Sequence, residues 1–353
     1  MTEKSTVRSV TYGLLRSLGL TVIFGDPGST EQPFLQEFPD DFTYVLALQE
    51  ASAIAMADAF AQVTRRPALV NLHSSAGLGN ALGNLVAAYH GNTPLIVTSG
   101  QQHRELVIGE PYLGNREAIT MPKPWVKWSY EPARAQDVPE AFMRAYAMAL
   151  KPPAGPVYLS VPMDDWKQPM PGPARVRSVS DRVAPDAERL RLFADRISAS
   201  RHPALVFGPE VDRSGGWEAA IALAEKLRAP VYGSPLLDRA SFRPVVGLIG
   251  DGSFQYSVQA LWTAAQHRLP VVYVVMRNNE YSILKSFAVL EETPGVPGLD
   301  LPGLDIATVA RGFGCRAADA GTTEELEREF KAALSADTPT VIVVATQPQK
   351  AML

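Results

Sequence analysis

The sequence contains a single cysteine, Cys315, among its 353 residues. One thiol cannot form an internal disulfide, and it cannot build a zinc site from several thiolates. An excess of basic residues is lacking too, because 33 Lys and Arg stand against 37 Asp and Glu, which gives a net charge of −4. We therefore expect no basic surface of the kind that binds nucleic acid.

Long apolar runs are also absent, and no stretch approaches the roughly 20 residues that a helix needs to cross a bilayer. Residues 1–6 are polar and do not resemble the apolar core of a secretion signal. Hydrophobic residues nevertheless make up 46% of the chain, which is enough for packed cores. The expected protein is globular, cytoplasmic and independent of membranes.

Helical and strand-like patterns alternate along residues 1–166 and predict a doubly wound α/β domain with a parallel sheet. Helices are expected at 7–18 and 50–63, and strands at 20–24, 68–72, 95–99 and 157–161. A linker rich in Pro and Arg follows at 167–184. Residues 185–242 then read as half of a further α/β unit, a partial central domain, and residues 244–353 as a third, shortened α/β domain.

Gly250, Asp251, Gly252 and Ser253 follow an apolar strand at 245–249, and Asn278 follows a second one at 271–276. Ligands of open α/β sheets bind at the carboxyl ends of the strands, where both groups are expected. A carboxylate, an amide oxygen and phosphate oxygens are the hard ligands that Mg²⁺ prefers, and glycines let phosphate approach the backbone. The alternative is an exposed turn without a ligand.

A second turn, from Asp26 through Pro27 and Gly28 to Ser29, leads from the first strand toward a helix. It is either part of a binding site or an ordinary turn in which Ser29 caps the helix.

Glu50 stands at the head of an Ala-rich helix behind the apolar residues 45–48. If Glu50 is buried, desolvation raises its pKa and lets it share a proton with a ligand nitrogen; the alternative is a surface carboxylate favoured by the helix dipole.

His73 comes directly after the strand at 68–72 and before a run of small residues that includes Asn80. Because substrates bind at the carboxyl ends of strands, His73 is a candidate for proton transfer. Its alternative is a structural or exposed histidine.

Together these motifs resemble thiamine diphosphate-dependent 2-keto-acid decarboxylases, in particular the benzoylformate decarboxylases. The resemblance rests on segments 26–29, 48–51, 71–74, 100–102, 126–130, 157–162 and the Gly250 to Asn279 cassette, in the family's order. It implies a pyrimidine-binding, a central and a diphosphate-binding domain, with thiamine diphosphate and Mg²⁺ as cofactors. It also implies a homodimer or homotetramer that releases an aldehyde and carbon dioxide from a small 2-keto acid.

The resemblance assigns roles to particular residues. Glu50 would bond the aminopyrimidine ring, while His73 and Ser29 would contact the substrate. Asp251, Asn278 and the backbone carbonyl of Glu280 would hold Mg²⁺. The further cofactor contacts that it implies are Asp26, Pro27, Gly28, Asn80, Gly252, Ser253 and Tyr281. Ile283 and Phe287 would line the substrate pocket, and the branched Ile283 favours smaller or aliphatic 2-keto acids.

One departure from the family is large. An interval on the order of 100 to 150 residues or more, about the size of a domain, is missing between Phe242 and Val246. Uncovering several hundred Å² of apolar surface costs on the order of 10 kcal/mol, so we expect good folding of the first domain only and impaired activity. The alternatives are a carboligase of the acetolactate synthase or benzaldehyde lyase type and an inactive truncated homologue.

Overall fold

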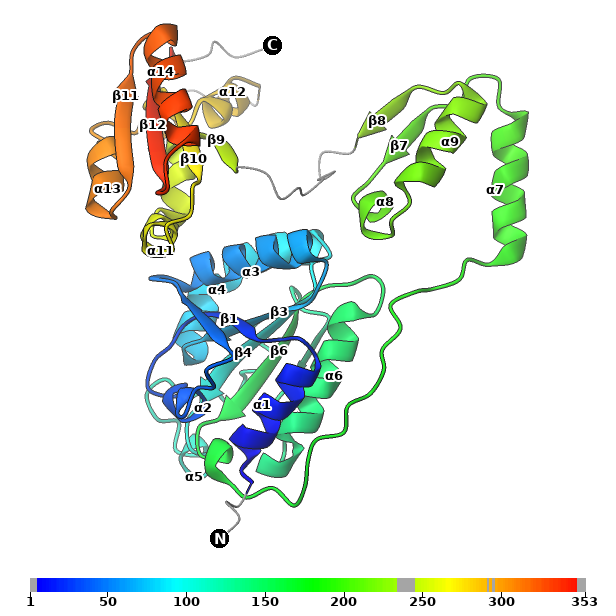
Figure 1. The fold of residues 1–353 in the computed structure, drawn as a ribbon, viewed down its shortest axis with the longest axis vertical. Helices are drawn as coiled ribbons and strands as arrows, with labels where there is room; N and C mark the ends of the chain where they lie inside the picture. Colours follow the sequence, from blue (N-terminus) through cyan, green and yellow to red (C-terminus); the bar gives the residue numbers. More distant parts are fainter. Residues whose placement is uncertain (1–4, 234–244, 291, 294–295, 348–353) are drawn as a thin grey trace. The chain divides into compact units, whose positions relative to one another are not determined.

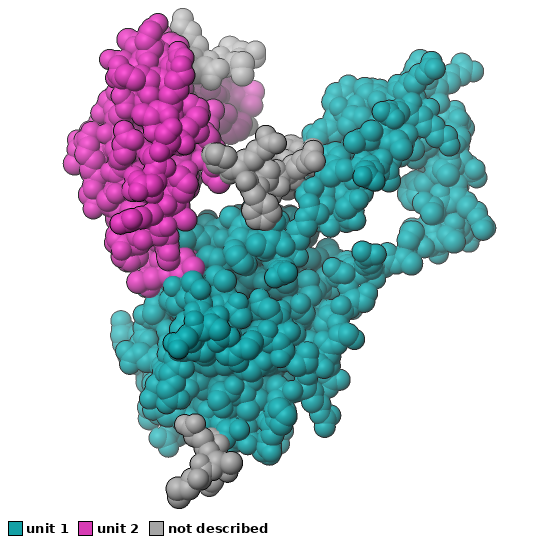
Figure 2. Space-filling view, in the orientation of Figure 1, with its two compact units in different colours: residues 1–44, 54–241 teal, residues 45–53, 242–353 magenta. Residues whose placement is uncertain are grey.

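The computed structural model describes residues 5–233, 245–290, 292–293 and 296–347 (Figure 1). The chain divides into two compact units, one formed by residues 1–44 and 54–241 and the other by residues 45–53 and 242–353 (Figure 2). No helix in these described ranges combines the length and the apolar character needed to span a membrane.

A six-stranded sheet in the order β2-β1-β3-β4-β6-β5 forms the centre of the N-terminal segment. Its strands are β1 (Val22–Asp26), β2 (Thr43–Leu46), β3 (Ala68–Leu72), β4 (Leu95–Gln101), β5 (Trp128–Tyr130) and β6 (Val157–Pro162). Every residue of β3, β4 and β6 is buried. Continuous burial of this kind is typical of a parallel sheet that helices cover on both faces.

Helices α3 and α4 cover one face of this sheet, and α1 and α6 cover the other (Figure 1). The helical elements are α1 (Val7–Ser17), α2 (Gln32–Leu35), α3 (Glu50–Thr64), α4 (Ser74–His90), α5 (Arg104–Val107), α6 (Val138–Leu150) and the 3₁₀ turns η1 (Ala135–Asp137) and η2 (Asp165–Lys167). Helix α1 begins with a capping box between Thr6 and Ser9.

The middle segment is small. It comprises α7 (Ala187–Ala199), β7 (Leu205–Phe207), α8 (Glu210–Arg213), α9 (Trp217–Leu227) and β8 (Val231–Gly233). Strands β7 and β8 pair in parallel, and α7 buries none of its side chains, so Leu190 and Phe193 are exposed. The proposed missing interval begins at Phe242, outside the described residues, and the three predicted domain boundaries remain predictions.

A four-stranded parallel sheet in the order β11-β12-β10-β9 forms the C-terminal segment. Its elements are β9 (Val246–Gly250), α10 (Asp251–Phe254), η3 (Gln255–Ser257), α11 (Ala260–Gln266), β10 (Val272–Arg277), α12 (Ser282–Leu290), α13 (Ile306–Gly312), β11 (Arg316–Ala320), α14 (Thr323–Leu334) and β12 (Thr340–Ala345).

Successive residues of the C-terminal strands enter two different cores, as the alternation of side chains along a strand requires. Val275 packs with Cys315 in one core, and its neighbour Val274 packs with Ala333 in the other. Strand β9 lies at the edge of the sheet, and its residues Val246 and Leu248 are exposed. The two side chains lie on the same face of the sheet, which a covering helix would normally protect.

The predicted α/β fold class and its parallel sheets are confirmed, with most elements placed within two residues. The first strand is the main shift, since it begins at Val22 and not at residue 20. Leu20 is buried, but its amide donates to the Leu15 carbonyl and so helps to end helix α1.

Candidate functional site

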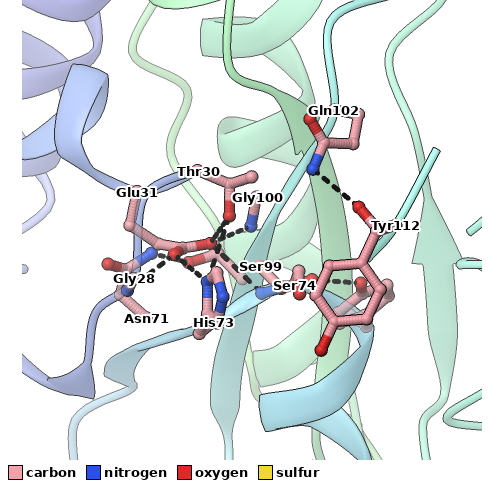
Figure 3. A network of polar contacts seen from close by, with 12 residues as sticks. Gly28, Thr30, Glu31, Asn71, His73, Ser74, Ser99, Gly100, Gln102 and Tyr112 are labelled. Carbon is pink, nitrogen blue, oxygen red and sulfur yellow. Dashed lines mark hydrogen bonds and ion pairs between the residues drawn. The ribbon is translucent and has the colours of Figure 1, made fainter. Parts of the chain in front are cut away.

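A buried carboxylate, that of Glu31, lies at the centre of a polar cluster at the carboxyl ends of β1, β3 and β4 (Figure 3). Its Oε1 accepts hydrogen bonds from the amide of Gly100 at 2.7 Å and the hydroxyl of Thr30 at 2.7 Å, and its Oε2 accepts one from the amide of Gly28 at 2.9 Å. The amide of Ser74 donates to Oε1 at 3.2 Å. Four donors offset the cost of burying this charge.

His73 joins this cluster directly. Its Nδ1 lies 2.8 Å from Glu31 Oε2 and 3.3 Å from Thr30 Oγ1, while its side chain keeps 23% of its surface exposed. The residue occupies the position before α4, but its side chain does not cap that helix. His73 is therefore held by a side chain that is 42 residues away in sequence, which supports a specific role for the ring.

The backbone around His73 is unusual. Ser74 has a φ of +44°, a left-handed conformation that costs a non-glycine residue on the order of 1–3 kcal/mol. Gly28 is required by a close approach, because a Cβ at this position would lie 2.1 Å from His73 Nδ1. Such features persist where the surrounding structure holds them, and they gather at functional sites.

Three buried polar atoms near this cluster have no hydrogen-bond partner within the described residues: Tyr44 OH, Asn71 Oδ1 and Ser74 Oγ. Burial, reinforced by the carboxylates of Glu31 and Asp26, raises the pKa of the Tyr44 hydroxyl. Unsatisfied polar atoms in a native site call for water or a ligand, so the cluster has capacity to bind one.

Ser29 does not cap a helix. It is exposed, and α2 begins at Gln32, with Glu31 in the preceding position, so the alternative of an N-cap serine is wrong. Ser29 lines a depression of about 700 Å³ together with Pro27 and Gly28. Asp26 ends β1 and is half-buried, whereas Asn80 lies exposed on α4. The binding roles of these residues remain predictions.

Glu50 is the first residue of α3 and is 8% exposed. Burial of a carboxylate at a helix start agrees with the expectation of a buried acid and not with that of a surface residue. Its bond to a cofactor remains a prediction.

Asp251 forms the centre of a second cluster, where β9 and β10 end. Its carboxylate is 3% exposed and accepts hydrogen bonds from the amides of Gly252 at 2.9 Å, Asn278 at 3.1 Å and Asn279 at 2.7 Å. The expected turn is in fact helical, because α10 begins at Asp251 itself. The interpretation as an exposed turn fails for Asp251, which is buried, although Ser253 is exposed.

Asn278 continues this cluster through its side chain. Its Oδ1 accepts from the amide of Glu280 at 3.1 Å, and its Nδ2 donates to Ser282 Oγ at 2.7 Å. The Glu280 carboxylate accepts from Lys285 and Ser282, and these two hydrogen bonds hold its pKa below the usual range. The side chain of Glu280 is thus already engaged, which leaves its backbone carbonyl as the group to consider for a metal.

The oxygens of Asp251, Asn278 and the Glu280 backbone match the hard ligands that Mg²⁺ takes alongside phosphate. No group of three or more His, Cys, Asp or Glu suitable for a metal occurs among the residues that the structure describes. A cation at Asp251 would therefore need amide and phosphate oxygens as well.

Tyr281 packs tightly on Gly252, where an added Cβ would lie 2.4 Å from Tyr281 Cε1. Ile283 and Phe287 follow on α12 and are 63% and 51% exposed. Helix α12 buries none of its residues, so the predicted substrate pocket is open on this helix.

Glu31 is the residue that the sequence analysis missed. Two of its donors, Ser74 and Gly100, are 43 and 69 residues away in sequence. The available signal was an acidic residue between a glycine turn and the apolar Phe34 and Leu35.

Two family models match the chain. Residues 5–116 match the thiamine pyrophosphate enzyme N-terminal TPP binding domain, and residues 194–344 match the corresponding C-terminal TPP binding domain. A benzoylformate decarboxylase of Pseudomonas aeruginosa is 32% identical, with 97% of this chain and 99% of the relative covered. That alignment extends over 522 positions, so this chain of 353 residues is the shorter protein.

The crystal structure of benzoylformate decarboxylase from Polynucleobacter necessarius is similar throughout, with a TM-score of 0.95, 35% identity and coverage of 99% of this chain and 100% of the other. A probable acetolactate synthase large subunit of Methanocaldococcus jannaschii is 26% identical to this chain. The match covers 69% of this chain and 44% of the relative, which is less than half of the relative's length. The chain therefore belongs to the thiamine pyrophosphate enzymes, and its relatives include the benzoylformate decarboxylases.

Proposed function

We propose that this protein is a carbon–carbon lyase that, like the benzoylformate decarboxylases, decarboxylates a 2-keto acid with thiamine diphosphate and Mg²⁺ to an aldehyde and carbon dioxide. The observation that carries the proposal is the His73–Glu31 pair at 2.8 Å, set at the carboxyl ends of strands in the segment that matches the N-terminal cofactor-binding domain. Such an edge is where open α/β sheets bind ligands.

The residues of the Asp251 cluster fit the diphosphate end of the cofactor. Asp251, Asn278 and the Glu280 carbonyl would hold Mg²⁺, and Gly252, Ser253 and Tyr281 would lie next to the diphosphate. Glu50, buried at the head of α3, would hydrogen-bond the pyrimidine ring. When bound, thiamine diphosphate supplies a ring that accepts the electron pair released as carbon dioxide leaves.

The protein groups would then orient the substrate and move protons. Ser29, exposed beside Gly28, would hold the substrate carboxylate. His73 would exchange a proton with the substrate oxygen, a contribution of about 10²- to 10⁴-fold for a positioned acid–base group. Ile283 and Phe287 would border the substrate's side chain, and the branched Ile283 favours a small or aliphatic one.

We further propose that the shortened chain works more slowly than its full-length relatives. Support comes from the exposed apolar residues Val246 and Leu248 on β9 and from the exposed α7 and α12. A homodimer or homotetramer is the proposed active form. The cytoplasm is the proposed compartment, since the one thiol, Cys315, is free and buried.

A carboligase of the acetolactate synthase or benzaldehyde lyase type is the second candidate, favoured by the match to acetolactate synthase. Analysis of products from pyruvate and from benzoylformate separates the two. Aldehyde as the main product supports the decarboxylase, acyloin or acetolactate as the main product supports the carboligase, and failure to bind thiamine diphosphate would reveal an inactive homologue.

A further inference from the structure

We propose that Glu31 is a positioning residue that keeps the imidazole proton of His73 on Nδ1, so that Nε2 is the ring atom that exchanges protons with a ligand. The role of Nε2 toward substrate rests on the proposed function, whereas the position of the proton on the free protein does not.

The Glu31 carboxylate is surrounded by hydrogen-bond donors. Three of them are the backbone amides of Gly28, Ser74 and Gly100, which can only donate. The Thr30 hydroxyl also donates to Glu31, at 2.7 Å. A carboxyl group surrounded by donors is held as the carboxylate, which has no proton to give to His73.

Thr30 presents a hydrogen-bond acceptor to His73. Its hydroxyl has one hydrogen, and that hydrogen is used by Glu31 Oε1. The Thr30 oxygen that lies 3.3 Å from His73 Nδ1 therefore turns a lone pair toward the ring. Both oxygens next to Nδ1 are acceptors, and an unprotonated Nδ1 would face two of them without a hydrogen bond.

Two further features hold the ring in this orientation. Glu31 is 1% exposed, so water does not compete for its carboxylate. The close contact between Gly28 and the ring leaves no room for a Cβ, which places His73 against the β1–α2 turn. With Nδ1 bonded in this way, Nε2 of the neutral ring carries the lone pair and can accept a proton and return it.

The test measures the tautomer directly. Long-range proton–nitrogen correlation spectra of the full chain, labelled with ¹⁵N-histidine, report which ring nitrogen is protonated, and the chain has five histidines to resolve. The variant H73N identifies the His73 signals by their loss. We expect a protonated Nδ1 and a bare Nε2 when the ring is neutral. A neutral His73 with its proton on Nε2 in the folded chain would overturn the proposal.

E31Q is the second arm, because a glutamine must turn its amide hydrogens toward groups that donate. We expect E31Q to lose the single tautomer and T30V to keep it, since T30V leaves the carboxylate in place. E37Q is the matched control, because Glu37 is exposed and pairs with Arg8 away from His73, and it should leave the His73 signals unchanged. A folded E31Q, judged by near-ultraviolet circular dichroism, that retains the Nδ1 proton contradicts the proposal.

Should E31Q fail to fold, the wild-type tautomer alone still decides. Turnover separates this inference from the proposed function: E31Q should lower kcat by about 10- to 100-fold with a smaller change in KM. A wild-type chain with the proton on Nδ1 but no turnover would contradict the proposed function and leave the inference standing. Full turnover by a chain whose neutral His73 carries its proton on Nε2 would contradict the inference and leave the proposed function standing.

Discussion

Asp251 accepts a hydrogen bond from the backbone amide of Asn278 at 3.1 Å, and this bond joins the ends of the adjacent strands β9 and β10. The two residues are 27 positions apart, yet they lie together because parallel strands end at the same edge of a sheet. With the neighbouring amide of Asn279 also bound, the carboxylate is fixed in place and keeps lone pairs for a cation.

Replacing Asp251 by asparagine should therefore weaken Mg²⁺ binding. Asp251→Asn removes the negative charge and turns an amide group toward donors, so we expect at least about a tenfold loss of affinity in the presence of thiamine diphosphate. Calorimetric titration with Mg²⁺ measures this affinity. Asp300→Asn is the control, because Asp300 is exposed and pairs only with Lys285 in the described structure; equal affinities of the two variants would speak against the metal site.

Gly28→Ala should displace His73. The new Cβ would lie 2.1 Å from the ring, so the ring must move away from Glu31, at a cost on the order of 1–3 kcal/mol in the free energy of unfolding. Gly83→Ala is the matched control, since this exposed glycine within α4 has open space around it and should gain up to about 1 kcal/mol. Urea denaturation measures the free energy of unfolding of the two variants. Equal values for Gly28→Ala and Gly83→Ala would exclude the tight contact at Gly28.

Glu50→Gln should preserve cofactor binding and reduce turnover. An amide keeps the shape of the side chain but cannot exchange a proton, so the expected loss in kcat is about 10²- to 10⁴-fold. Steady-state kinetics and calorimetry on the same preparation measure the two quantities. Glu37→Gln, on the surface, should change neither. Unimpaired turnover by Glu50→Gln would remove Glu50 from the proposed chemistry.

Substrate choice tests the role of Ile283. If its branched side chain limits the pocket, pyruvate and longer aliphatic 2-keto acids should be turned over with a higher kcat/KM than benzoylformate, and Ile283→Ala should shift the ratio toward benzoylformate. Rates of aldehyde release from each acid measure the ratio. A strong wild-type preference for benzoylformate, as the names of the relatives would suggest, would refute the size argument.

Cys315 gives a prediction on pH. Burial raises the pKa of its thiol from 9 to about 11. The unfolded chain thus releases this proton first, so the thiol's contribution is fully present below pH 9 and is lost as the pH rises toward 11, by up to about 3 kcal/mol. Cys315→Ser should lack this component when unfolding is followed in urea between pH 8 and 11. Parallel pH profiles of the two proteins would show that the thiol is not buried.

Local patterns were enough to predict much of the fold. The apolar runs at β3 and β4 and the amphipathic helix α1 appear directly in the sequence. Asp251 and Asn278 could be found because each follows such a run. Glu31 could not be found in this way, because its environment is made by Ser74 at the start of α4 and Gly100 in β4, which are distant in sequence. Ser29 was misplaced because a glycine turn followed by serine looks locally like a helix cap, whereas two further residues, Thr30 and Glu31, precede the start of α2.

The most direct test is aldehyde release from benzoylformate and pyruvate by the full chain, with and without thiamine diphosphate and Mg²⁺, beside the Pseudomonas aeruginosa relative. We predict aldehyde production that depends on both cofactors and is slower than that of the relative. Aldehyde production without the cofactors, no aldehyde in their presence, or a rate equal to that of the relative would contradict the account.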